Sequence, residues 1–172
     1  MNRKACSSGE SGMSLLELII AVPLLAALFA SAAILLWWIL RIYAYSISDW
    51  ELIAEVRRSA ASITEDISYA ESVVLDHDNK KMTIRTFGCN AEEAVYVEYH
   101  WKQSPYPHLV KDGQPMTGES RLGQIYILEF EEKKLEPDLL QLSILGKNQR
   151  TGHEYRMETV VQLYDGKIVE RF

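Results

Sequence analysis

The chain has 172 residues, enough for one domain of ordinary size and hardly enough for two. Apolar residues make up 48% and charged residues 24%, which excludes a disordered or low-complexity protein. The formal net charge of −6 argues against binding to nucleic acid or to an anionic membrane surface, since both favour Lys- and Arg-rich faces. We therefore expect no direct nucleic acid binding.

The N-terminal third contains a long apolar run. From Leu18 to Leu40 no residue is charged, and a run of about 18 or more such residues can cross a bilayer as a helix. Arg3 and Lys4 precede the run, and basic residues hold that end of a span in the cytoplasm. The sequence predicts a single-pass protein of the cytoplasmic (inner) membrane, with a cytoplasmic N-terminus and an extracytoplasmic C-terminal domain.

Two details of this run need interpretation. Ala30-Ser31-Ala32 has the form of a signal-peptidase site, but residues 34–40 are strongly apolar, so a chain cut there would begin with a hydrophobic plug. Anchoring without signal-peptidase cleavage is favoured. Pro23 lies inside the run and removes one backbone donor, which predicts a kink or a locally melted turn.

Glu17 stands at the edge of the apolar run, where a carboxylate costs free energy unless it is paired or at headgroup level. The surrounding residues combine a short basic peptide, Gly12, a hydrophobic Met13, and an acidic residue five positions into the chain that follows Gly12. This pattern resembles the leader of type IV pilins and pseudopilins. Met13 departs from the commonest residue, Phe. The alternative is that Glu17 simply lies in water beside the headgroups.

The resemblance implies processing and assembly. A prepilin peptidase would cut between Gly12 and Met13 and methylate the new amine of Met13, and Glu17 would pair with the N-terminal amine of a neighbouring subunit. The implied partners are this peptidase, other pilins or pseudopilins through the N-terminal helix, the inner-membrane assembly platform, and membrane lipid before assembly. DNA would be met only indirectly, in a competence pilus.

The apolar run continues into an amphipathic segment. Apolar residues spaced by three and four are Trp50, Ile53, Val56, Ala60, Ile63, Ile67, Ala70 and Val74. The acidic and basic residues between them, Asp49 and Asp66 included, are expected on a solvated face. One helix is expected from the leader to about residue 70, and Arg41, Tyr43, Tyr45 and Trp50 are expected at the membrane boundary.

After residue 73 the apolar period changes to two, which predicts strands. Strands are expected at residues 82–87, 95–102, 124–130, 140–144, 155–163 and 167–171. Asp78-Asn79-Lys80 predicts a turn, Asp165-Gly166 predicts a type I′ hairpin, and residues 103–123 are expected to be a long loop.

The predicted fold is α+β and pilin-like, with one long N-terminal helix packed on an antiparallel β-sheet. Its parts are a leader (1–12), a transmembrane and assembly helix (13–41), the amphipathic half of the same helix (42–74) and a β-sheet part (75–172). The order of elements is similar to the J-type minor pseudopilin of type II secretion and to related minor pilins and competence pseudopilins.

No pattern for catalysis, a cofactor or a metal is evident. His77, His100, His108 and His153 are scattered, and Cys6 and Cys89 flank the apolar run, so no intramolecular disulfide is expected. The segment 76–79 has oxygen ligands but lacks EF-hand spacing, so a tight turn is favoured over a calcium loop. Around one expected hairpin loop lie the basic residues Lys147, Arg150, His153 and Arg156, which could meet DNA phosphates but are more typical of a soluble sheet edge.

Three classes of protein therefore remain open. The leading hypothesis is a non-enzymatic subunit of a type II secretion pseudopilus or a type IV or competence pilus, placed at or near its tip. The second is an unprocessed, single-pass anchored extracytoplasmic binding domain, in which Gly12 and Glu17 are coincidental. The third is a membrane-tethered enzyme whose site is assembled from scattered residues.

Overall fold

The structure is a computed structural model that describes residues 15–87, 94–117, 125–164 and 166–171. The chain divides into two units, Met1–Tyr43 and Ala44–Phe172. Gly12, Met13, Cys6 and Cys89 lie outside the described residues. The predictions made for these four residues stay predictions.

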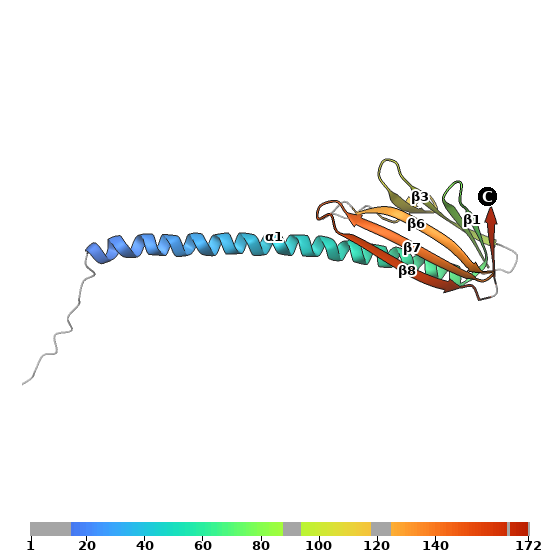
Figure 1. Ribbon diagram of the computed structural model, residues 1–172, viewed down its shortest axis with the longest axis horizontal. Helices are drawn as coiled ribbons and strands as arrows, with labels where there is room; N and C mark the ends of the chain where they lie inside the picture. The colour runs from blue at the N-terminus through green and yellow to red at the C-terminus, as the bar shows by residue number, and fades with distance from the viewer. Residues whose placement is uncertain (1–14, 88–93, 118–124, 165, 172) are drawn as a thin grey trace, which may run out of the picture. The chain divides into compact units, whose positions relative to one another are not determined.

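Helix α1 runs from Leu15 to Ser68 and is unbroken at Pro23, so the expected melted turn is not found (Figure 1). The helix ends at Ser68, close to the expected residue 70 but short of residue 74, where its amphipathic half was expected to end. Strand β1 (Ala70–Asp76) begins two residues after the end of the helix. Ala70 and Val74 therefore lie in a strand instead of on the helical stripe. Burial explains the difference, because Val73 and Leu75 alternate toward the core with the period of a strand.

The first sheet has six strands in the order β5-β4-β3-β2-β1-β9. Its further members are β2 (Lys81–Phe87), β3 (Ala94–Lys102), β4 (His108–Lys111), β5 (Gln114–Pro115) and β9 (Lys167–Arg171). All neighbours are antiparallel except β1 and β9, which are parallel. The expected loop at 103–123 was therefore wrong in part, because β4 and β5 lie within it.

The second sheet is an antiparallel meander of β6 (Ile125–Glu136), β7 (Leu139–Asn148) and β8 (Glu154–Gln162). The α+β class and the helix packed on antiparallel-rich strands are confirmed, but the strands form two sheets instead of one. The hairpin expected at Asp165-Gly166 was wrong, because β8 and β9 belong to different sheets. At Gly166 a Cβ atom would lie 2.6 Å from the carbonyl oxygen of Ala70, so glycine allows the chain to pass close to β1.

Both sheets contribute to one hydrophobic core with the C-terminal part of α1. The buried residues of this part of the helix are Ser48, Leu52, Val56, Ser59, Ala60, Ile63 and Ile67. The stripe thus begins with Ser48 and Leu52. Trp50, which was expected on the stripe, is 68% exposed, because a 3.6-residue period through Leu52 and Val56 leaves it on another face.

Candidate functional site

The N-terminal part of α1 is the segment that the sequence singles out for function. By length and composition α1 is long and apolar enough to cross a membrane, and it is the one such helix among the described residues. Its charge-free run of 23 residues would span about 35 Å, against about 30 Å for the apolar layer of a bilayer.

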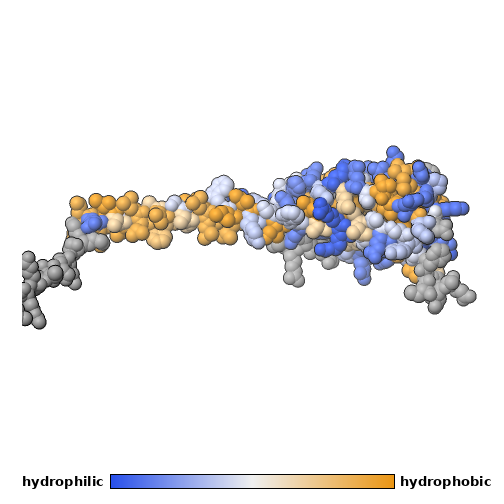
Figure 2. All heavy atoms as spheres, turned by 90° about the horizontal axis from the view of Figure 1, so that it is seen from below, coloured by the Kyte–Doolittle hydropathy of each residue, from blue (hydrophilic) through white to orange (hydrophobic). Residues whose placement is uncertain are grey.

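Large apolar side chains cover this segment and are exposed. Examples are Leu15 at 77%, Phe29 at 67% and Leu35 at 64%, and Figure 2 shows apolar residues along the visible face of the segment. Leaving a large apolar side chain in water instead of burying it costs about 1.5–3 kcal/mol. The segment therefore requires apolar surroundings that the chain itself does not supply within the described residues.

The few polar groups of the segment are compatible with apolar surroundings. Ser31 donates a hydrogen bond to the carbonyl of Leu28 at 2.8 Å, so its hydroxyl is satisfied within the helix. Pro23 leaves the carbonyl of Ile19 without its helical donor, a defect that transmembrane helices tolerate. At the end of the run the Arg41 guanidinium lies over the ring of Trp37, 5.5 Å from its centroid.

Glu17 lies in the first turn of α1 and its side chain is exposed. A carboxylate is favourable there, because the helix N-terminus carries a partial positive charge that contributes about 0.3–1 kcal/mol. The structure places Glu17 on the same apolar helix as the exposed leucines, isoleucines and phenylalanine. The predicted processing residues Gly12 and Met13 precede the described part of the chain.

In the second unit, a polar cluster ties the β7–β8 hairpin to α1. The amide of Asn148 donates to Ser48 Oγ at 2.7 Å and to Asp49 Oδ1 at 3.1 Å, and Thr151 Oγ1 donates to the same carboxylate oxygen at 2.5 Å. Asn148 Oδ1 in turn accepts from the amide of Arg150 at 2.9 Å. Because Asn148 and Ser48 are fully buried, these bonds fix the hairpin to one turn of the helix.

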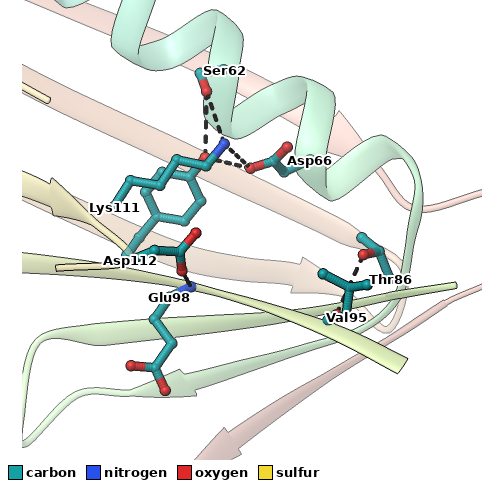
Figure 3. A network of polar contacts seen from close by, with 8 residues as sticks. Ser62, Asp66, Thr86, Val95, Glu98, Lys111 and Asp112 are labelled. Atoms are coloured by element: carbon teal, nitrogen blue, oxygen red, sulfur yellow. Dashed lines mark hydrogen bonds and ion pairs between the residues drawn. The ribbon is translucent and has the colours of Figure 1, made fainter. Parts of the chain in front are cut away.

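A second polar cluster ties the six-stranded sheet to α1, farther along the helix. Lys111 Nζ lies 2.7 Å from Asp66 Oδ2 and 3.4 Å from Ser62 Oγ, and Figure 3 shows its side chain reaching both residues. Tyr99 donates to the same carboxylate. Burial acts to lower the pKa of Lys111, but its hydrogen bonds with Asp66 and Tyr99 outweigh burial and raise it.

The sequence did not indicate these two clusters. Asp49 and Asp66 were expected on a solvated face, and that expectation was wrong for both, because each accepts hydrogen bonds from strand or hairpin residues. One signal was present for Asn148. It continues the inward-facing register of Leu142, Ile144 and Gly146, where a polar residue needs a buried partner.

Three of the four basic residues near the β7–β8 loop have side-chain partners among the described residues. Lys147 pairs with Glu154 at 2.7 Å, and Arg156 pairs with Glu129 at 2.6 Å. The Arg150 guanidinium lies over the ring of Tyr45, 5.6 Å from its centroid. A phosphate ligand would have to compete with these contacts, so the arrangement favours the interpretation as a soluble, charged hairpin.

The turn predicted at residues 78–80 is confirmed. Asp76 accepts hydrogen bonds from the backbone N–H of Asn79 at 3.1 Å and from its side-chain amide at 2.8 Å. These bonds, the side-chain one first, lower the pKa of Asp76. Lys80 completes the turn with a φ of 49°. Within the described ranges, no group of three or more His, Cys, Asp and Glu residues could hold a metal ion.

Comparison of the chain with known protein families, with curated proteins and with solved structures finds no match.

Proposed function

We propose that the chain is a minor pilin-like (pseudopilin) subunit. In this proposal a prepilin peptidase cuts between Gly12 and Met13, and the mature chain joins a type II secretion pseudopilus or a type IV or competence pilus. The observation that carries the proposal is Glu17, a carboxylate in the first turn of a helix whose apolar side chains are exposed around it. The spacing from Gly12 to Glu17 supports it.

The mechanism is transfer of the helix from lipid to a bundle of like helices. Before assembly, residues 15–40 lie in the cytoplasmic membrane, with the N-terminus cytoplasmic and Ala44–Phe172 extracytoplasmic. In the bundle, Glu17 faces the methylated ammonium group of Met13 of a neighbouring subunit. A carboxylate in apolar surroundings is stable only when it is paired, so this pair sets the axial register between subunits.

The assembly role assigned here is that of a minor subunit at or near the filament tip, most similar to the J type. No catalytic step is assigned to it. Its other partners are the inner-membrane assembly platform and the neighbouring pseudopilins, which it meets through the N-terminal helix.

The N-terminal peptide mass from cells with and without prepilin peptidase tests the proposal. We expect a chain that begins at methylated Met13 only when the peptidase is present. An intact N-terminus in both strains would refute the proposal. It would favour an unprocessed, membrane-anchored binding domain, an alternative that the separate core of Ala44–Phe172 allows.

A further inference from the structure

The two sheets end in strands β5, β9, β6 and β8, and the first three are short or covered. Strand β5 has two residues, one of them Pro115. At β9, the N–H of Ile168 donates to the carbonyl of Pro137 at 3.0 Å, and Lys134 Nζ donates to the carbonyl of Ile168 at 2.8 Å. These groups occupy the outer edge of β9, because Ile168 directs both backbone groups away from β1.

The edge of β6 is covered in the same manner. The N–H of Ile127 donates to the carbonyl of Pro107 at 2.9 Å, and Trp101 Nε1 donates to the carbonyl of Ile127 at 2.8 Å. Covering or shortening an edge is how soluble proteins prevent unwanted strand pairing. Strand β8 has no such protection among the described residues.

Strand β8 is nine residues long, contains no Pro or Gly, and pairs with β7 without a bulge (Figure 1). The N–H of Asn148 donates to the carbonyl of His153, so this pair is hydrogen-bonded, and such pairs alternate along an antiparallel ladder. Every second residue of β8 therefore directs its N–H and C=O away from β7. These residues are Glu154, Arg156, Glu158, Val160 and Gln162, and all five are exposed.

We propose that the outer edge of β8 binds an extended segment of another protein, which adds a fourth strand to the sheet. The free backbone groups at alternate positions fit a polypeptide strand and no other ligand class so well. The side chains select its chemistry. Glu154 and Arg156 already have ion-pair partners, whereas Glu158 has none in the described part of the chain. The bound segment thus places a Lys or Arg opposite Glu158.

A second copy of the chain is a poorer occupant. Among the described strands it offers only its own β8 as an open edge, because the other edges are covered or short. Gly146 lies against Val56, and Asn148 lies against Ser48. Strand β7 is therefore antiparallel to residues 44–68 of α1, and β8 is parallel to them. Antiparallel pairing of two β8 strands would make these helical segments run in opposite directions. This argument excludes antiparallel β8–β8 pairing, and it rests on the proposed function, which requires parallel helices.

The test uses the full chain in lipid nanodiscs and two synthetic nine-residue peptides, TVTVKVTVT and TVTVEVTVT. Amide hydrogen exchange is measured residue by residue. We expect the lysine peptide to slow exchange at Arg156, Glu158 and Val160 by about tenfold, and the glutamate peptide to act more weakly. The N–H groups of Met157 and Thr159 face β7 and should not change.

Two variants and one matched control variant make the test specific. Glu158→Lys should reverse the preference, so that the glutamate peptide protects better. Val160→Pro removes one outward N–H and should abolish protection, whereas the matched Val160→Thr, which keeps that N–H, should not. Unchanged thermal unfolding of each variant shows that its fold is retained.

If neither peptide slows amide exchange in β8, the proposal is overturned. So would protection that rises with chain concentration without peptide, since that result would assign the edge to a second copy. Neither peptide measurement depends on the leader or on Glu17. An intact N-terminus in both strains would refute the filament proposal and leave a positive peptide result standing.

Discussion

Tyr99 of β3 donates a hydrogen bond from its hydroxyl to Asp66 Oδ2 of α1, at 2.5 Å. The Tyr99 side chain is fully buried, and the same carboxylate accepts from Lys111 of β4. One acidic residue of the helix thus holds two neighbouring strands of the six-stranded sheet. Hydrogen bonds to a charged group contribute more than neutral ones, about 1.5–3 kcal/mol.

Tyr99→Phe should lower the free energy of unfolding of the second unit by about 1.5–3 kcal/mol, because it removes this bond and keeps the ring. Urea unfolding followed by tryptophan fluorescence measures the change. Tyr164→Phe is the matched control, since Tyr164 is 95% exposed and its substitution should have no measurable effect. Equal stability of the two variants would contradict the assignment.

Tyr99 should also limit stability at high pH. Burial raises the pKa of Tyr99 to about 12, and the hydrogen bond to Asp66 adds to this. The folded state thus keeps a proton that the unfolded chain loses near pH 10. The contribution is fully present below pH 10 and is lost as the pH rises through about 12. In Tyr99→Phe this alkaline loss should be smaller, as read from unfolding curves between these pH values.

Glu132 of β6 should make stability depend on pH in the neutral range. Burial raises the pKa of Glu132 from 4.5 to about 7, and the charge of Glu131 raises it further against the opposing effect of Lys80. The folded state therefore holds a proton that the unfolded chain has released. This stability is full below about pH 4.5 and is lost as the pH rises through 7.

Glu132→Gln should remove this loss and stabilise the protein at pH 8 by on the order of 1 kcal/mol, a figure reduced for partial solvent screening. Unfolding curves at pH 5 and pH 8 give the difference. Glu136→Gln, at an exposed position of the same strand, serves as control and should keep the wild-type pH dependence. A variant at Glu132 with that same dependence would disprove the assignment.

Gly146 sets the distance between β7 and the helix. A Cβ atom there would lie 2.6 Å from Val56 Cγ2 and 2.8 Å from Leu52 Cδ1, closer than packed atoms allow. Gly146→Ala should cost about 1–3 kcal/mol through overpacking. Adding Val56→Ala should recover part of that loss relative to Val56→Ala alone. Additive effects in this double-mutant cycle would show that a side chain at position 146 does not contact Val56.

Glu17→Gln tests assembly under the proposed function. The variant should still be cut after Gly12 but should enter filaments much less, because a neutral amide cannot neutralise the ammonium group of Met13. The measurement is the fraction of the chain recovered in sheared filaments. Glu65→Gln, an exposed acidic residue of the same helix, should assemble normally. Normal assembly of Glu17→Gln would exclude a role for this carboxylate in register.

The local pattern predicted the elements better than their ends. The strands at residues 82–87, 95–102 and 167–171 were located correctly to within a residue or two at each end, because alternation along a half-buried strand is visible in the sequence. Ala70 and Val74 were wrongly assigned to the helical stripe, because they fit both a helical and a strand period. Only their packing decides between these patterns.

By itself, the sequence determined the α+β class, the apolar segment and the long helix, since composition and periodicity act over neighbouring residues. Tertiary structure alone decided that the strands form two sheets and that β9 joins β1. It also brought Asp66 to Tyr99 and Asn148 to Ser48, and left β8 as an open edge. These features depend on contacts between residues far apart in the chain, and a single sequence contains no local signal for which distant strand supplies the partner of a buried polar group or an edge.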